Sequence, residues 1–484
     1  VGQGFMRSYR TSITSYGSAL RLTHDGGFLV GGNGNSTESG ENSPFLVRTG
    51  PTGDTLWTRI YGVQGIASCN SVEAIASGGY FVVGQSQSTA AVPPDIMLLR
   101  ADEDGLPLWC RTIGGPYQDV AMASTLTEDG GVAVAGWRMT ASGEGNAYVV
   151  RFNADGDTLW TRTYDTGEGS TAMSICNTSD GGFALAGIHT TPIPDFRAPW
   201  IMRIDANGTP LWNTVLDLTL SDAAWISPLA DGGFIVTGHL YSSVTFLARI
   251  NGTGAAEWVR SYDLPNTDNK AYCVQPTADG GYALCGHNGG HPWMALTDEQ
   301  GDVLWQRIYG DEIKTRNQLV VVGEDGFAMV SNKNWDGLGM QLIRTDADGR
   351  NGCEGHLPLV VADLTVETFS PTVVSGSYGI ITEVDPRVSS GCSVHVTCSS
   401  TGMVDEPNEG FRIHPNPSSG RLFVSGIEGP FRCEVVDITG KVVGPRVAFA
   451  TAGTIDVGTL AQGKYVLRLT RENGSVVHRS FIKE

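Results

Sequence analysis

The sequence predicts an all-β protein built from seven copies of a four-stranded repeat. A phrase of the type Asp-Gly-Gly-aromatic returns about every 50 residues, a spacing found among propeller repeats. Its copies begin at Asp25, Ser77, Asp129, Asp180, Asp231 and Asp279, with a degenerate copy at Glu324. Glycine makes up 64 of 484 residues, which suits many tight turns, because glycine adopts positive φ without steric cost.

Each repeat contains four strand-like runs. In the third repeat these are residues 121–127, 132–136, 147–152 and 158–164. Asp-Gly and Gly-Gly between such runs are hairpin signals, since the turns require positive φ. Four short antiparallel strands per repeat are typical of a β-propeller blade. We therefore predict seven blades.

The last strand of a repeat carries a tryptophan, and six copies exist. They are Trp57, Trp109, Trp160, Trp212, Trp258 and Trp305. The seventh repeat ends without this strand, but residues 5–9 match the pattern of residues 57–61. We expect the N-terminal strand to complete the last blade and close a propeller over residues 1–353, which removes an open sheet edge. The tryptophans are expected to pack between blades, with an aromatic ligand cage as the alternative.

The loops between second and third strands vary in length, whereas the other turns are nearly constant. Binding residues often lie on variable loops held by a rigid scaffold, so the face with these loops is the candidate binding face. Residues just after the second strands would form a ring there, which includes Ile188, and nearby loops would add Trp200, Trp293, Asn334, Trp335 and Asp336. The candidate ligand residues are Asn33, Gln85, Trp137, His239, His287, Asn332 and Trp335. Aromatic and amide groups suit a glycan or a protein surface, although ordinary solvated loop residues would look the same.

Composition excludes several partners. The formal net charge of −19 argues against nucleic acid, which is bound through lysine and arginine patches. No apolar run approaches the roughly 18 residues of a transmembrane segment. The chain starts Val1-Gly2-Gln3-Gly4, unlike a signal peptide, so we expect a mature form with any leader removed.

Motifs for catalysis, metals and cofactors are missing from the sequence. The acidic turns at Asp102 and Asp346 resemble the start of a calcium loop, but Ile113 and Leu357 occupy the position of the required glutamate. The nine histidines show no zinc-binding spacing, and there is no G-x-S-x-G motif. Residues 153–160 resemble blades of quinone-dependent dehydrogenases, without their adjacent cysteines. We therefore expect no metal, no cofactor and no enzyme, with a glycoside hydrolase or lyase as a minor alternative.

None of the nine cysteines forms a C-x-x-C pair. Cys273 and Cys285 flank one predicted hairpin turn and are candidates for cross-strand neighbours. Cys353, Cys392 and Cys398 cluster after the repeats. One or two disulfides are expected in an oxidising compartment, and the odd total leaves one thiol unpaired.

The pattern changes after Cys353. Residues 354–410 read as a β-rich extension or stalk with a polar linker, and residues 411–484 as an immunoglobulin-like β-sandwich. This last region resembles the type A C-terminal sorting domain of type IX secretion cargo. The resemblance rests on Pro415, Asn416, Pro417, Gly440, Lys441, Gly463, Tyr465 and Lys483. It implies a secreted or surface protein of a Gram-negative bacterium that is read by the type IX translocon and, where the domain is cleaved, by a sortase.

Two functions follow as predictions. The first is a non-catalytic binding or structural protein of the cell surface, with a glycan or protein as ligand of the loop face. The second is a self-assembling subunit whose retained C-terminal domain docks on a neighbour, giving a homopolymer, since head-to-tail contacts that do not close produce fibres.

Overall fold

The structure is a computed structural model, and it describes most of the chain. The described residues are 4–10, 15–35, 42–62, 66–87, 93–190, 197–218, 221–240, 244–264, 268–310, 318–321, 326–333, 339–352, 354–355, 359–376, 380–384, 387–389, 393–399, 412–414, 420–425, 430–436, 441–449, 453–471 and 476–483. Every regular element in these ranges is a β-strand, so the all-β prediction is confirmed. Contacts divide the chain into two compact units, residues 1–394 and 395–484.

The first unit contains seven antiparallel sheets, numbered here in chain order. Sheet 1 contains β2 (Ser15–Leu22), β3 (Phe28–Asn35), β4 (Asn42–Thr49) and β5 (Thr55–Gly62). Sheet 2 contains β6 (Ile66–Ala74), β7 (Tyr80–Gln87), β8 (Asp95–Ala101) and β9 (Pro107–Gly114). Sheet 3 contains β10 (Asp119–Leu126), β11 (Val132–Met139), β12 (Gly145–Phe152) and β13 (Thr158–Asp165). Sheet 4 contains β14 (Ser170–Asn177), β15 (Phe183–Thr190), β16 (Arg197–Ile204) and β17 (Pro210–Leu216).

The remaining sheets follow the same order. Sheet 5 contains β18 (Ser221–Pro228), β19 (Phe234–Leu240), β20 (Val244–Ile250) and β21 (Ala256–Asp263). Sheet 6 contains β22 (Asn269–Pro276), β23 (Tyr282–Asn288), β24 (His291–Thr297) and β25 (Val303–Tyr309). Sheet 7 contains β26 (Gln318–Val321), β27 (Phe327–Lys333), β28 (Gly339–Arg344) and, from the N-terminus, β1 (Phe5–Arg10).

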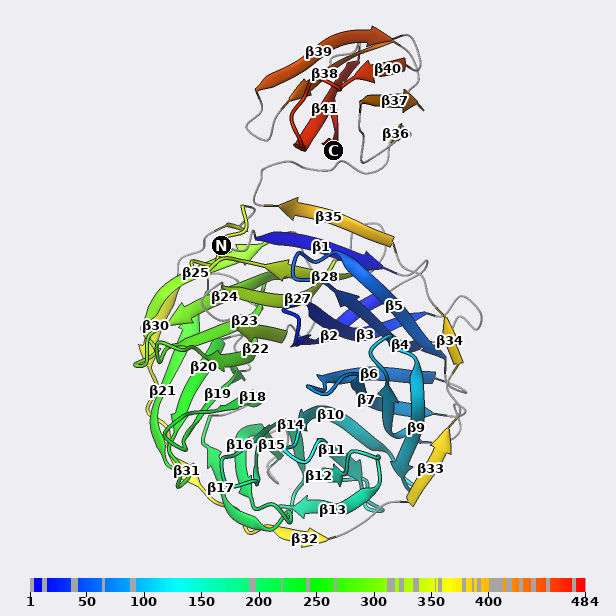
Figure 1. The fold of residues 1–484 in the computed structure, drawn as a ribbon. Helices are drawn as coiled ribbons and strands as arrows, with labels where there is room; N and C mark the ends of the chain where they lie inside the picture. Colours follow the sequence, from blue (N-terminus) through cyan, green and yellow to red (C-terminus); the bar gives the residue numbers. More distant parts are fainter. Residues whose placement is uncertain are drawn as a thin grey trace. The chain divides into compact units, whose positions relative to one another are not determined.

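These seven sheets lie side by side around a ring, with the first strand of each innermost (Figure 1). Each innermost strand contacts the innermost strand of the next sheet, and β26 contacts β2. The N-terminal strand behaves as predicted: β1 pairs antiparallel with β28, with Phe5 opposite Arg344 and Tyr9 opposite Met340. The first and last strands of the repeat region therefore lie in one sheet. The repeated four-stranded sheets have a propeller-like arrangement.

A strand-forming segment after the repeats runs around the outside of the ring. We name residues 354–389 the belt. Its strands pair with the last strands of sheets 6, 5, 4, 3, 2 and 1 in that order (Figure 1). They are β29 (Glu354–Gly355), β30 (Val360–Asp363), β31 (Thr368–Phe369), β32 (Val374–Gly376), β33 (Ile380–Val384) and β34 (Arg387–Ser389). In sheet 7, β35 (Ser393–Ser399) lies next to β1 at the edge of the sheet. The first unit thus extends past residue 353, where the sequence suggested a boundary.

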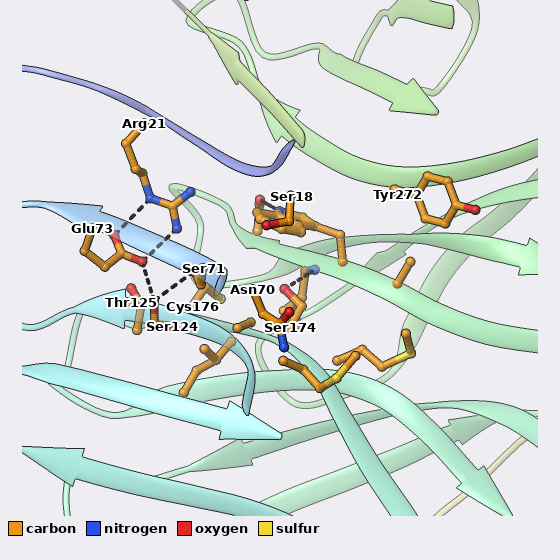
Figure 2. Close-up of a pocket in the computed structure, with 18 of the residues that line it drawn as sticks. Ser18, Arg21, Asn70, Ser71, Glu73, Ser124, Thr125, Ser174, Cys176 and Tyr272 are labelled. Carbon is orange, nitrogen blue, oxygen red and sulfur yellow. Dashed lines mark hydrogen bonds and ion pairs between the residues drawn. The ribbon is translucent and has the colours of Figure 1, made fainter. Parts of the chain in front are cut away.

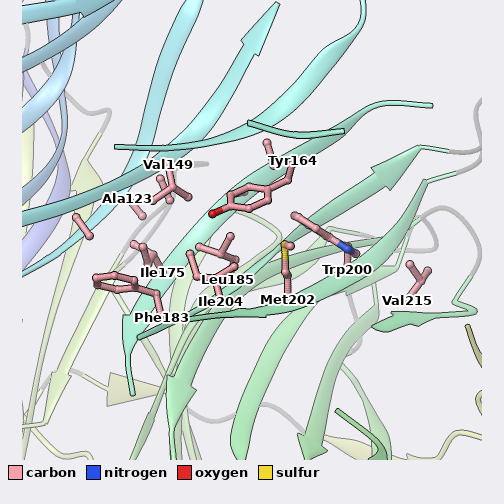
Figure 3. Packing of buried hydrophobic residues seen from close by; sticks show 14 of the residues in the cluster. Ala123, Val149, Tyr164, Ile175, Phe183, Leu185, Trp200, Met202, Ile204 and Val215 are labelled. Carbon is pink, nitrogen blue, oxygen red and sulfur yellow. The ribbon is translucent and has the colours of Figure 1, made fainter. Parts of the chain in front are cut away.

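Apolar side chains fill the spaces between neighbouring sheets. Figure 3 shows the cluster between sheets 3 and 4, where Tyr164 and Val149 face Leu185 and Met202. The prediction that the recurrent tryptophans pack between repeats is confirmed: the ring centroids of five lie 5.6–6.2 Å from that of an aromatic residue of the next sheet. These pairs are Trp57–Tyr80, Trp160–Phe183, Trp212–Phe234, Trp258–Tyr282 and Trp305–Phe327. Phe5 takes the same place against Phe28. The sixth tryptophan, Trp109, packs against a buried cluster that includes Val132 of the next sheet.

Tyrosine hydroxyls add a repeated polar tie between sheets. Each buried hydroxyl donates to a glycine carbonyl in the next sheet's second hairpin turn, at 2.6–2.9 Å. The pairs are Tyr9–Gly53, Tyr61–Gly105, Tyr164–Gly208, Tyr262–Gly301 and Tyr309–Gly349. A buried hydroxyl without a partner would be costly, so these bonds select one spacing between neighbouring sheets.

The second unit consists of two antiparallel sheets with a shared core. One contains β36 (Arg412–His414), β37 (Arg421–Ser425) and β40 (Gly453–Asp456). The other contains β39 (Val442–Phe449), β38 (Phe431–Val436), β41 (Gly463–Arg471) and β42 (Val476–Lys483). Leu422 and Ile455 of the first sheet are packed in one buried cluster with Phe431 and Leu467 of the second.

Candidate functional site

Six innermost strands contain a β-bulge, in which one extra residue is left out of the pairing with the second strand. In sheet 3, for example, Ala121 pairs with Gly136 and Ala123 with Ala135, so Met122 is the extra residue. The same shift occurs in six sheets, and the extra residues are Ser18, Asn70, Met122, Met173, Ala224 and Tyr272. Bulges redirect side chains and are frequent beside functional sites.

All six bulge residues line a pocket of about 700 Å³ enclosed by the innermost strands. We name it the axial pocket. Its described lining comes from sheets 1–6, and its two sides differ in chemistry (Figure 2). Sheets 1 and 2 contribute polar groups such as Ser18, Asn70 and Glu73. Sheets 3 to 6 contribute mainly apolar or aromatic ones, including Met122, Met173, Ile175, Trp225 and Tyr272.

An ion pair organises the polar side. Arg21 Nη2 lies 2.7 Å from Glu73 Oε1, and Arg21 Nε donates to Glu73 Oε2 at 2.9 Å. Ser124 Oγ donates to Glu73 Oε1 at 2.9 Å, as Figure 2 shows. Burial alone would lower the pKa of Arg21, but the charge and hydrogen bonds of Glu73 hold it above the ordinary value. Arg21 therefore stays charged, and its hydrogen-bonded pair with Glu73 presents a fixed polar surface to the pocket.

A row of three aromatic rings lies at the other side, across sheets 5 and 6. The ring centroid of Tyr272 is 6.2 Å from the ring centroid of His239 and 5.4 Å from that of His287. A carboxylate oxygen lies near each histidine ring. Asp222 Oδ2 is 3.8 Å from His239 Nε2, and Asp268 Oδ2 is 3.4 Å from His287 Nε2. Tyr272, the bulge residue, lines the axial pocket, so this row connects the pocket with the candidate face of the sequence analysis.

The predicted ligand residues are placed unequally. Asn33 and Gln85 line the axial pocket. Asn33 also accepts from Cys69 N at 2.7 Å and donates to Cys69 O at 3.1 Å, and Asn332 holds Gly17 of the next sheet in the same way. The side-chain amides of these two buried residues therefore join neighbouring sheets through hydrogen bonds. Trp137 and His239 are half-buried, and His287 is buried.

Two expectations need correction. The candidate residues do not follow the second strands but belong to them, since β3 continues to Asn35 and β23 to Asn288. Trp200 and Trp293 are not loop side chains but core residues, 0% and 1% exposed. Strand propensity and burial between sheets outweigh the loop position that the sequence suggested. Trp335, Asn334 and Asp336 lie outside the described residues, as do most residues of the variable loops.

The sequence analysis missed the bulge residues. A signal for them exists, because each bulge lies opposite a glycine of the second strand, as Met122 lies beside Gly136. The equivalent glycines are Gly32, Gly84, Gly136, Gly187, Gly238 and Gly286. A recurrent glycine inside a strand indicates a bulge or a close backbone approach.

A buried carboxylate lies at the start of sheet 3. Asp119 is 0% exposed, 3.7 Å from Arg138 Nε, and its backbone nitrogen donates to Pro94 O. The equivalent residues Ser170 and Asn269 instead donate a side-chain hydrogen bond to a carbonyl of the preceding sheet. Burial raises the pKa of Asp119 to about 6, against the opposing effect of Arg138.

We expect Asp119→Asn to stabilise the protein at neutral pH. A carboxylate whose pKa is raised in the folded state binds its proton more tightly when folded, so it costs stability as pH rises from about 4 through about 6. The amide removes a penalty on the order of 2 kcal/mol at pH 8 and has no such advantage at pH 4. Thermal unfolding of both proteins at the two pH values measures the difference. Equal gains at pH 4 and pH 8 would show that the charge is not the cause.

Four of the predicted sorting residues lie in the described part of the chain. Gly463 is the direct strand partner of Lys483, which is 7% exposed. Tyr465 donates from its hydroxyl to Ala461 O at 2.9 Å, and Lys441 is exposed. Pro415, Asn416, Pro417 and Gly440 lie outside the described residues.

The family comparison agrees with this second unit. Residues 412–484 match the family model described as the secretion system C-terminal sorting domain. The chain therefore carries a type IX secretion sorting domain at its C-terminal end, and it is exported to the cell surface or the extracellular space of a Gram-negative bacterium. No curated protein matches the chain. Within the part of the chain that the structure describes, no helix could cross a membrane.

Solved structures resemble the chain weakly. A protein of unknown function from Bacteroides caccae is 18% identical and covers 57% of this chain and 92% of its own, with a TM-score of 0.38. A puromycin hydrolase mutant is 14% identical over 69% of this chain and 54% of its own, with a TM-score of 0.42. Sqt1 from Chaetomium thermophilum is 11% identical and covers 70% of this chain and 97% of its own, with a TM-score of 0.40. Scores this low support no argument about function.

Proposed function

We propose that the protein is an exported, non-catalytic binding protein that takes a glycan into its axial pocket. In this proposal the seven sheets are the blades of a β-propeller, and the second unit is an immunoglobulin-like domain read by the type IX translocon. The observation that carries the proposal is the pocket itself, with an ordered polar side around Arg21 and Glu73 and an apolar side around Trp225 and Tyr272.

A sugar ring suits this division. Its hydroxyl groups exchange hydrogen bonds with charged and amide side chains, while its C–H faces pack on aromatic rings. Trp225 is held by a hydrogen bond from its Nε1 to Ser227 Oγ at 3.1 Å, and Tyr272 lies between two histidine rings. Rings fixed in this way lose little freedom when a ligand stacks on them.

The alternatives have less support. Of the described residues that line the pocket, Glu73 alone is a carboxylate, and it is already paired with Arg21. Glycoside hydrolysis ordinarily uses two carboxylates, so binding without catalysis is favoured. Self-assembly through open sheet edges is disfavoured because the belt pairs the outer edges of sheets 1–6. Docking of the C-terminal domain on a neighbouring chain remains the competing route to a polymer.

A glycan array with the intact protein tests the proposal. We expect Tyr272→Ala and Trp225→Ala to weaken binding of the best glycan about fivefold each, since stacking on a ring contributes about 1 kcal/mol. Tyr117→Ala is the control, because this 38% exposed tyrosine does not line the pocket. Calorimetric titration gives the affinities. Unchanged affinity of both pocket variants would reject the pocket as the binding site, and binding of a protein ligand alone would reject the glycan.

A further inference from the structure

Two cysteines of sheet 6 face each other across neighbouring strands. Cys273 of β22 is the direct register partner of Cys285 of β23, between the pairs Ala271–Gly286 and Val274–Leu284. Both are 0% exposed, and as direct cross-strand partners they carry their side chains on the same face of the sheet. The sequence analysis suggested these residues as cross-strand neighbours, and that prediction is confirmed.

The geometry of this pair suits a covalent bond. Residues directly opposite in an antiparallel ladder have Cα atoms about 4.5–5.5 Å apart, which lies within the range of about 4.4–6.8 Å found in disulfides. The other cysteines with described side chains are not arranged in this way. Cys69 lies opposite Gly84, Cys110 opposite Leu99, Cys176 opposite Ala184, and Cys433 opposite Val447 and Leu469.

We propose that Cys273 and Cys285 form an intramolecular disulfide in the exported protein. The sorting domain sends the chain through an oxidising compartment, where such bonds form and persist. The oxidant is a protein disulfide of that compartment. One thiolate attacks it, and the second thiolate then resolves the mixed disulfide. Two thiols lose two protons and two electrons in total, and the oxidant becomes a dithiol. This inference depends on export and does not depend on the proposed glycan binding.

The burial of the pair determines when the bond forms. Burial and the neighbouring Cys273 thiol raise the pKa of Cys285 well above its ordinary value, so little thiolate is present in the folded protein. The oxidant also has no access to a fully buried pair. The bond is therefore expected to form before β22 and β23 are packed between their neighbouring sheets, and to resist mild reductants afterwards.

Peptide mass mapping of the full-length protein tests the proposal. Protein collected outside the cells is denatured at harvest in the presence of N-ethylmaleimide and without reductant, and is then digested. We expect a cross-linked peptide that contains Cys273 and Cys285 and is about 2 Da lighter than the sum of its two thiol peptides, while Cys110 is found alkylated. Alkylation of both Cys273 and Cys285, or a cross-link from either one to another cysteine, would overturn the proposal.

A stability measurement gives a second readout. The same protein produced in a reducing cytosol is expected to carry both thiols free and to unfold about 4 °C below the exported form, because a disulfide restricts the unfolded chain. Reduction of the exported form under denaturing conditions, followed by refolding with reductant, should remove the difference. Equal unfolding temperatures for the exported protein and the reduced protein would count against a bond in the folded population.

Discussion

A chain that ends at Gly352 is expected to unfold about 10 °C below a chain that ends at Ser399. Both lack the two sheets of the second unit, and they differ by the belt with β35. The belt contributes nineteen strand-paired positions to sheets 1–6. At a few tenths of a kcal/mol for each cross-strand pair, the loss is on the order of 5 kcal/mol. Calorimetry of the two truncated proteins measures the difference in unfolding temperature.

The same truncation should change association. Without the belt, the last strands of six sheets present open edges, and open edges pair with other chains. Light scattering should therefore report growing particles for the shorter chain and a stable mass for the longer one. Equal unfolding temperatures and equal masses would contradict the pairing of the belt with these edges.

Replacing Gly136 by alanine is expected to destabilise the protein by about 3 kcal/mol. A Cβ at this position would lie 1.8 Å from the Val120 carbonyl oxygen and 3.1 Å from the Cα atom of Ala121. The backbone at the bulge must therefore move, which is a costly form of overpacking. Denaturant unfolding measures the change in the free energy of unfolding.

Gly50→Ala is the matched control. No atom lies within 4 Å of a Cβ at Gly50, so we expect a change within about 0.5 kcal/mol. A loss for Gly136→Ala as small as that of the control would mean that β10 and β11 do not approach as described, and the shape of the axial pocket would be in doubt.

Features with local causes were predictable from the sequence. The Asp-Gly-Gly turns form as expected, because Gly26 adopts a φ of 77° and Asp25 accepts from Gly27 N at 3.1 Å. The role of tryptophan was predictable from its recurrence at one place in six of the seven repeats. The place of β1 followed from a missing strand at one end and a matching segment at the other.

Features that depend on distant partners were not predictable in the same way. The Asp25 carboxylate is held 2.6 Å from Arg48 Nη2, a contact between the β2–β3 turn and β4 that no local pattern identifies. The belt strands β29 and β31 have two residues each, which is too short for an alternating pattern, and they form because an open sheet edge lies beside them. The axial pocket depends on bulges, whose sequence signal is a single strand glycine. Asn33 was predicted to bind a ligand because it is a polar residue of the candidate ring. Its hydrogen bonds to Cys69 of the next sheet cannot be read from the sequence.

Hydrogen–deuterium exchange of the intact protein, with and without its best glycan, tests the central claim most directly. Bulge residues such as Ala224 and Tyr272 are left out of the ladder, so their amides should exchange early unless a ligand covers them. We predict that saturating glycan slows exchange around Ala224 in β18 and Tyr272 in β22 and leaves β41 of the second unit unchanged. Protection confined to the second unit, or none at saturation, would contradict binding in the axial pocket.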